Sequence, residues 1–407
     1  MVSDRRTDSR RGWVVVAILA VTVTVSYGVL TYSFGVMLVP MQHELRISRV
    51  ALTGAFSVAL LVWALVGLPL GMLLDRYSPR VPMVTGAALG VLFVLAWSQV
   101  RSATELYLIF AGLGVAMAAL LYNSAFAVAT MWFQESRRQA ITVISFAGAF
   151  ASLIFSPLTG RLILDFGWRS ALVILAAMMA TTIPLLALVR APDTARAAGK
   201  PRWLVGTNRF GALRSRRFWL MAVALSLGSF SWSAVVVQLV PLLLDEGRSI
   251  GFATFAAGIV GIAQLPGRLA FALFGGTLAG GRAPLASSLL AAVALLILAA
   301  ARSEFWLLTS VTLFGMSAGL LTLVSANAPA ELFARQDYGI VLGATYACSN
   351  LARAAAPFLS AAIALLPGNY LTLLISLAVL NGLAGFLGAA AFRGLRMPGP
   401  APSVITL

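Results

Sequence analysis

The sequence predicts an all-α membrane protein with twelve transmembrane helices in two pseudo-symmetric six-helix bundles. Of the 407 residues, 60% are hydrophobic and only 10% are charged, and the mean hydropathy is +0.94. Long apolar runs alternate with short polar breaks, and each run can cross ~30 Å of hydrocarbon as a helix. Water-soluble domains of this size carry far more charge.

The apolar runs define the predicted spans, and each is expected to be helical because its backbone must satisfy its own hydrogen bonds in lipid. They lie near residues 13–40, 49–74, 81–100, 104–131, 138–163, 168–189, 217–243, 250–276, 283–301, 304–328, 338–366 and 369–392.

Two features recur between the halves of the chain. The run Leu38-Val39-Pro40 recurs as Leu239-Val240-Pro241, and Pro157 recurs as Pro357, at offsets of 201 and 200 residues. Internal repeats of this kind are typical of secondary transporters. We therefore predict an N-terminal bundle over residues 1–190, a basic cytoplasmic linker over 191–216 and a C-terminal bundle over 217–407.

The distribution of positive charge predicts the orientation. With both termini placed in the cytoplasm, twenty Lys and Arg residues fall on the inner side and seven on the outer side. An inner excess of this size sets topology. We expect a multi-pass protein of the bacterial inner (cell) membrane.

Several classes of function lack support in the sequence. The chain has one cysteine and one histidine, so a disulfide, a metal site or a histidine-based catalytic group is not predicted. It contains no phosphate-binding G-x-x-x-x-G-K-[ST] motif, and glycines such as Gly114, Gly258 and Gly261 are expected at helix contacts instead. The net charge is +16. Most of the Lys and Arg residues that produce it lie between apolar segments, where they suit anionic lipid rather than nucleic acid. We predict neither an enzyme nor a cofactor.

Two arginines lie inside apolar runs, Arg268 in 250–276 and Arg353 in 338–366. An arginine at the bilayer centre costs at least ~2.5–3.5 kcal/mol and cannot escape by losing its proton. A guanidinium can bind a carboxylate through two hydrogen bonds. The two residues are therefore predicted to bind an anion with two carboxylates, or one carboxylate and another acceptor. The alternative is a structural role for either one.

Other polar side chains at similar depth are secondary candidates for the same site, with hydrogen bonding between helices as the alternative. They are Tyr27, Tyr32, Tyr122, Asn123, Trp232, Gln264, Asn327, Tyr346 and Asn350.

The loop after the second span reads Gly71-Met-Leu-Leu-Asp75-Arg76-Tyr-Ser-Pro-Arg80. It resembles the G-x3-D-R-x-G-R-R motif of the major facilitator superfamily, with serine and proline at two of the motif's positions. The resemblance implies the major facilitator fold. It also implies that Asp75, Arg76 and Arg80 latch an inner gate and that Gly71 allows close helix approach.

Within that superfamily the chain resembles the monocarboxylate transporters and the oxalate–formate exchangers. The resemblance rests on Gly12-Trp13, Trp132-Phe133, Trp168-Arg169 and Arg268. It implies aromatic cavity residues at Tyr122 and Tyr346. The animal monocarboxylate carriers have an aspartate and a lysine where this chain has Gln264 and Thr31, so a carboxylate proton switch at that place is excluded.

These observations predict a monomeric secondary active transporter of small organic anions, mono- or dicarboxylates, working by alternating access. Exchange and proton symport both remain open as modes. No Asp or Glu lies deep in any predicted span, which favours exchange. The alternatives are an exporter of drugs or other metabolites and a non-transporting membrane receptor.

Overall fold

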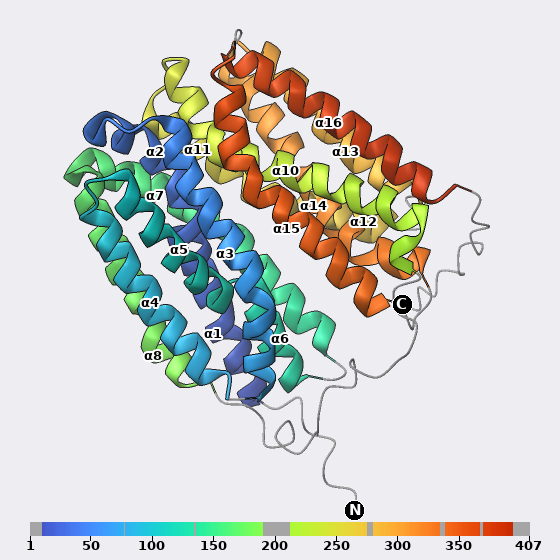
Figure 1. The fold of residues 1–407 in the computed structure, drawn as a ribbon, viewed down its shortest axis with the longest axis horizontal. Coiled ribbons are helices and arrows are strands. Elements are labelled where there is room, and N and C mark those ends of the chain that lie inside the picture. Colours follow the sequence, from blue (N-terminus) through green and yellow to red (C-terminus); the bar gives the residue numbers. More distant parts are fainter. Residues whose placement is uncertain are drawn as a thin grey trace, which may run out of the picture. The chain divides into compact units, whose positions relative to one another are not determined.

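The computed structural model describes residues 10–76, 78–133, 136–189, 212–274, 280–333, 338–366 and 369–393. Figure 1 shows that the described chain is built from helices, most of them long. The predicted linker 191–216 lies outside the described residues up to position 211. The all-helical membrane fold predicted from hydropathy is confirmed.

Helices of the first half of the chain follow the predicted spans closely. They are α1 (Arg10–Tyr27), the π-helical segment η1 (Gly28–Tyr32), α2 (Ser33–Leu45), α3 (Arg49–Arg76), α4 (Arg80–Ser98), α5 (Ala103–Leu120), α6 (Tyr122–Trp132), α7 (Arg137–Ala180) and α8 (Thr182–Ala187).

Helices of the second half begin after a short 3₁₀ turn. They are η3 (Ala212–Arg214), α10 (Arg216–Asp245), α11 (Ile250–Ile262), α12 (Gln264–Phe274), α13 (Arg282–Ala300), α14 (Glu304–Leu332), α15 (Tyr338–Ile363) and α16 (Asn369–Ala391). By length and hydropathy, ten helical segments of the described chain qualify as membrane spans. One of them, 139–187, covers two predicted spans on either side of Gly167, whose φ of 77° marks the turn between them.

Contacts group the chain into two compact units that do not coincide with its two halves. Unit 1 comprises Met1–Leu204, Ser233–Ile262 and Arg353–Asn369. Unit 2 comprises Val205–Trp232, Ala263–Ala352 and Tyr370–Leu407. The division into bundles 1–190 and 217–407 stays a prediction.

Aromatic rings fill the core of unit 1. Phe34 stacks on Phe56 with ring centroids 4.4 Å apart, and Phe110 meets Trp97 edge-on at 5.0 Å. All four side chains are buried. These contacts join α2, α3, α4 and α5, so four consecutive helices share one aromatic core.

Glycines allow two helix pairs of unit 1 to approach closely, as predicted for Gly114, Gly258 and Gly261. A Cβ at Gly114 would lie 2.4 Å from the carbonyl oxygen of Ala59, and one at Gly261 would lie 1.9 Å from Ser152 Oγ. Ser152 also donates a 2.8 Å hydrogen bond to the carbonyl of Gly258. Small residues serve this purpose in membrane helices.

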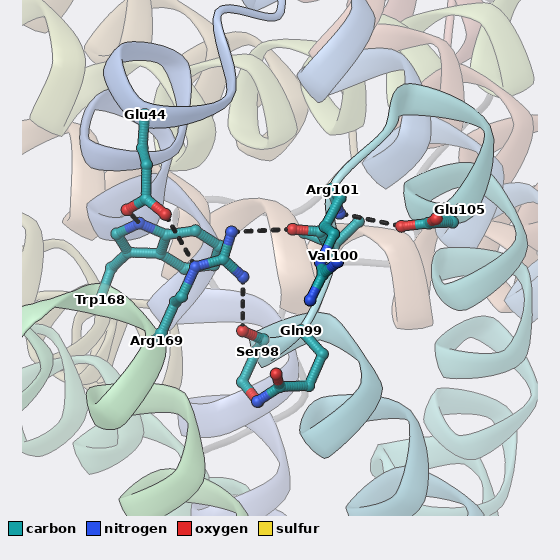
Figure 2. Close-up of polar contacts among 8 residues, drawn as sticks. All are labelled: Glu44, Ser98, Gln99, Val100, Arg101, Glu105, Trp168 and Arg169. Carbon is teal, nitrogen blue, oxygen red and sulfur yellow. Dashed lines mark hydrogen bonds and ion pairs between the residues drawn. The ribbon is translucent and has the colours of Figure 1, made fainter.

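A polar cluster in unit 1 gives the pair Trp168-Arg169 a structural role (Figure 2). Arg169 bonds Glu44 Oε1 at 2.8 Å and the carbonyls of Ser98 and Val100 at 2.6 and 2.9 Å. Trp168 donates its indole N–H to the same carboxylate. The guanidinium thus satisfies carbonyls at the end of α4 and ties it to the end of α2.

Candidate functional site

Arg268 lies in the second turn of α12, in unit 2, and bonds a residue of the same helix. Its Nη2 donates a 3.1 Å hydrogen bond to Gln264 Oε1, one turn earlier. Gln264 is only 8% exposed, and Arg268 is half-buried. Gln264 therefore orients the guanidinium while leaving its full positive charge in place.

A break in the helix precedes this pair. α11 ends at Ile262 and α12 begins at Gln264. Pro266 supplies a physical reason, because it has no N–H to bond the carbonyl of Ile262 and its ring crowds that carbonyl. Discontinuous membrane helices expose backbone polar groups and commonly mark transporter binding sites. The apolar run 250–276 predicts one continuous span, so this break was not predicted from the sequence.

Glycines hold α12 against α14. A Cβ at Gly267 would lie 2.1 Å from the carbonyl oxygen of Met316, and one at Gly319 would lie 2.1 Å from that of Gln264. The two backbones are therefore in direct contact along the first turn of α12, immediately after the helix break. This contact fixes the turn that carries Gln264 and Arg268.

A second group of predicted residues meets in unit 1. The ring of Tyr122 lies 4.7 Å from that of Tyr27 and 5.1 Å from that of Phe126. The Tyr122 hydroxyl donates a 3.2 Å hydrogen bond to the carbonyl of Ser145. The charge of Arg353 acts electrostatically on Tyr27. The structure thus brings two predicted tyrosines into contact.

Irregular backbone flanks these tyrosines as well. Tyr27 and Tyr32 border the π-helical segment Gly28–Tyr32, and Tyr122 begins α6 after Leu121 leaves the helical conformation with a ψ of −176°. π-helical segments occur frequently at functional sites. Three predicted binding regions therefore coincide with departures from regular α-helix, and none of these departures was predicted.

Arg353 is held in unit 1 through its backbone. Ser233 donates a 2.9 Å hydrogen bond to the carbonyl of Arg353, which ties α15 to α10. The side chain of Arg353 is half-buried. The contacts of the chain place Arg353 in unit 1 and Arg268 in unit 2.

The remaining candidates divide between the units. Asn123 in unit 1 is exposed. In unit 2, Trp232 stacks on Phe314 at 6.0 Å, and exposed Asn327 bonds the carbonyl of Leu323 on its own helix. Tyr346 is 44% exposed and Asn350 is half-buried. Trp232 thus packs between helices and Asn327 bonds its own helix, and neither contact is the interhelical hydrogen bond given as the alternative.

The predicted gate motif is only partly described. The side chains of Asp75 and Arg76, at the end of α3, lie outside the described residues. Arg80 is exposed at the start of α4. A Cβ at Gly71 would meet no described atom within 4 Å. The close helix approach predicted for Gly71 is therefore not seen in the described part of the chain.

Sequence reasoning missed one polar position beside Tyr32. Ser156 and Tyr32 line a small cavity in unit 1 of about 10 Å³, whose other walls are apolar residues of α10 and α11. The buried Ser156 hydroxyl has no hydrogen-bond partner among the described residues. A cavity of this size is close to the minimum for one water molecule. Nothing in the sequence around Ser156, which precedes Pro157, indicated that this serine would line a cavity.

Comparison with known proteins shows the family. Residues 19–357 match the Major Facilitator Superfamily. The chain belongs to this superfamily. Monocarboxylate transporter 13 of Rattus norvegicus is 29% identical over 334 residues, 80% of this chain and 76% of the relative. The oxalate:formate antiporter of Oxalobacter formigenes is 27% identical over 251 residues, 60% of this chain and 57% of the relative.

Further matches support the family and the fold. The uncharacterized MFS-type transporter YcxA of Bacillus subtilis is 24% identical over 410 residues, 95% of this chain and 97% of the relative. Among solved structures, the nucleoside transporter NupG has a TM-score of 0.75 at 14% identity, covering 95% of this chain and 100% of that one. At that identity the likeness concerns the fold alone.

Proposed function

We propose that this superfamily member is a secondary active transporter of small organic anions, mono- or dicarboxylates. The observation that carries the proposal is the guanidinium of Arg268, oriented by Gln264 at a break within a membrane helix. A permanent positive charge at such a place suits a carboxylate, which it can bind bidentately. The names of two relatives, a monocarboxylate transporter and an oxalate:formate antiporter, agree with this class.

The other predicted residues have subordinate roles in this proposal. Arg353, whose charge acts on Tyr27 in unit 1, binds a second acceptor on the anion or raises the local positive potential. Asp75, Arg76 and Arg80 latch the gate. The protein works by alternating access as a monomer in the bacterial inner membrane, with both termini in the cytoplasm.

Uptake by reconstituted vesicles tests the role of Arg268. Vesicles are assayed with labelled mono- and dicarboxylates, including formate and oxalate. Arg268→Ala should lower kcat/KM at least ~30-fold, because losing one partner of a buried charge pair costs about 2 kcal/mol or more. Arg268→Lys should retain part of the activity, since it keeps the charge and loses the planar fork.

Arg101→Ala is the matched control, because Arg101 is an exposed arginine outside the site and its loss should leave uptake unchanged. Undiminished uptake by Arg268→Ala would refute the assignment of that residue. Binding of a carboxylate without flux in the wild-type protein would favour the receptor alternative.

The same vesicles separate the two coupling modes. The absence of Asp and Glu from the interior of the predicted spans favours exchange, so unlabelled anion preloaded inside should accelerate uptake of labelled anion. Accumulation that requires a pH gradient and ignores the preloaded anion would instead establish proton symport.

A further inference from the structure

Positively charged side chains are concentrated at one end of unit 2. Helices α10 and α13 begin there and α16 ends there, as two contacts show. Arg217 Nη2 lies 3.5 Å from the carbonyl of Arg393, and a Cβ at Gly281 would lie 3.0 Å from Ala389 Cα. The described arginines at this end are Arg214, Arg216, Arg217, Arg282 and Arg393. The described acidic side chain at this end is Glu331, which bonds the N–H of Gly280 at 3.2 Å.

An apolar groove of about 260 Å³ starts beside this end. α10 runs between α15 and α16 in Figure 1 and supplies one wall. The lining includes Trp219, Val223, Leu227 and Phe230 from α10, Cys348 from α15 and Leu380 from α16. The α10 residues recur every three or four positions, so they form one stripe along the helix. At 1.5 Å per residue, that stripe is roughly 16 Å long.

Arg216 stands at the charged end of the same stripe. It lies three residues before Trp219 and seven before Val223, so the three share one helix face. Arg216 is exposed, and it makes no hydrogen bond or ion pair with any described residue. Trp219 is 54% exposed, as is typical of tryptophan at a membrane interface. Along this face of α10, the positive charge of Arg216 is followed by the ring of Trp219 and then by the apolar groove.

We propose that this groove binds an anionic phospholipid from the adjacent leaflet. The phosphate would lie on Arg216 and its arginine neighbours, with one acyl chain along α10 between α15 and α16. Basic pockets between membrane helices suit anionic headgroups. The site lies apart from Arg268 and Gln264 in sequence and in its lining, so it does not depend on the transported anion.

Charge argues against two other occupants of the groove, a second copy of the chain and a segment of the same chain. In a two-fold symmetric dimer with this end at its centre, like-charged arginines would face one another. The chain's own segments 190–211 and 394–407 carry Arg190, Arg196, Lys200, Arg202, Arg209 and Arg396 against one acid, Asp193. Both segments are therefore basic, and a basic end of the molecule repels them.

The sole cysteine of the chain gives a direct test, because Cys348 lines the groove. The rate at which N-ethylmaleimide alkylates Cys348 is measured in detergent micelles doped with phosphatidylglycerol or with phosphatidylcholine of identical chains. Phosphatidylglycerol should slow the reaction at least about fivefold as the site fills, and phosphatidylcholine should slow it much less. Arg216→Gln should remove this difference, and Arg101→Gln, a matched exposed arginine elsewhere, should retain it.

Native mass spectrometry supplies a second measurement that does not depend on the reactivity of Cys348. The wild type and Arg101→Gln should retain bound phosphatidylglycerol, and Arg216→Gln should lose most of it. Equal protection by both lipids, or equal retention by all three proteins, would overturn the proposal. Protection that follows protein concentration rather than lipid would overturn it in favour of a second copy covering the groove. Protection that persists in lipid-free detergent would overturn it in favour of a segment of the same chain.

Discussion

At the scale of single residues, Gln264 determines how Arg268 presents its charge. The 3.1 Å hydrogen bond from the guanidinium to the glutamine amide orients the arginine without neutralising it. An acid at the same position would form an ion pair with Arg268, and a substrate carboxylate would then have to compete with it. This chain has a neutral glutamine at a position where the animal monocarboxylate carriers have an aspartate, and this difference changes the charge beside the arginine.

Gln264→Glu should therefore weaken substrate binding if Arg268 binds the anion. At pH 7.5 the new carboxylate should raise KM for the transported anion by roughly tenfold or more, equivalent to about 1.4 kcal/mol. Protonation of the glutamate removes its charge, so KM should fall toward the wild-type value as the pH is lowered. The measurement is initial uptake by vesicles from about pH 5 to 8, the range in which a perturbed glutamate can titrate.

Gln264→Met is the matched control, since it removes the hydrogen bond without adding charge and should change KM less, with no added pH dependence. A Gln264→Glu protein that transports with unchanged KM over the whole pH range would show that the anion does not reach Arg268.

At the scale of helices, the position of α12 depends on glycines of two helices. Gly267 on α12 and Gly319 on α14 allow the backbones of the two helices to touch. A Cβ added at Gly267 would lie 2.1 Å from Met316 O, and one added at Gly319 would lie 2.1 Å from Gln264 O. Pro266 interrupts the hydrogen bonding of the preceding turn. The break and the contact together set where the turn from Gln264 to Arg268 lies, so binding depends on residues that carry no polar side chain.

Gly267→Ala should consequently damage the site without removing any charged group. Its Cβ must push α14 away, which we expect to cost about 1–3 kcal/mol in unfolding free energy and to lower transport at least about tenfold. Gly343→Ala on α15 is the matched control, because its Cβ would meet no described atom within 4 Å and alanine favours helix.

Thermal unfolding in detergent and uptake by vesicles measure the two effects. A Gly267→Ala protein that unfolds and transports like the wild type would show that α12 and α14 can separate without consequence for Arg268.

At the scale of the whole molecule, unit 1 contains contacts between segments of the two sequence halves. Arg49 at the start of α3 binds Asp245 at the end of α10, with Nη1 and Oδ2 2.7 Å apart. Its Nε also donates a 3.0 Å hydrogen bond to Gln42. Ser57 accepts a 3.1 Å hydrogen bond from the N–H of Phe358. Alternating access between two bundles would require such contacts to break during transport.

Cross-linking Arg49→Cys to Asp245→Cys, in a Cys348→Ser background, should therefore stop transport. The ion pair is partly exposed, with side chains 18% and 43% accessible, and such pairs contribute at most about 1 kcal/mol. Its loss alone should leave the double variant active. A short bifunctional methanethiosulfonate should then lower uptake at least about tenfold, and a reductant should restore it.

A monofunctional reagent of the same chemistry is the control and should leave most of the uptake. Full transport by the cross-linked protein would mean that this contact stays closed throughout the cycle.

The positions of the membrane helices, the family resemblance and the two arginines inside apolar runs can all be recognised in the amino-acid sequence. Hydropathy and charge are local properties, so a run such as 250–276 can be recognised without knowing its neighbours. The three-dimensional structure was needed to show where helices break, that Gln264 bonds Arg268, that Tyr27 contacts Tyr122, and that Arg353 belongs to a different unit from Arg268. The Tyr27–Tyr122 contact and the unit of Arg353 depend on residues far apart in the chain, and no local pattern records which of them will meet. The helix break and the Gln264–Arg268 bond involve residues close together in the chain, but hydropathy and charge record neither backbone conformation nor side-chain rotamers.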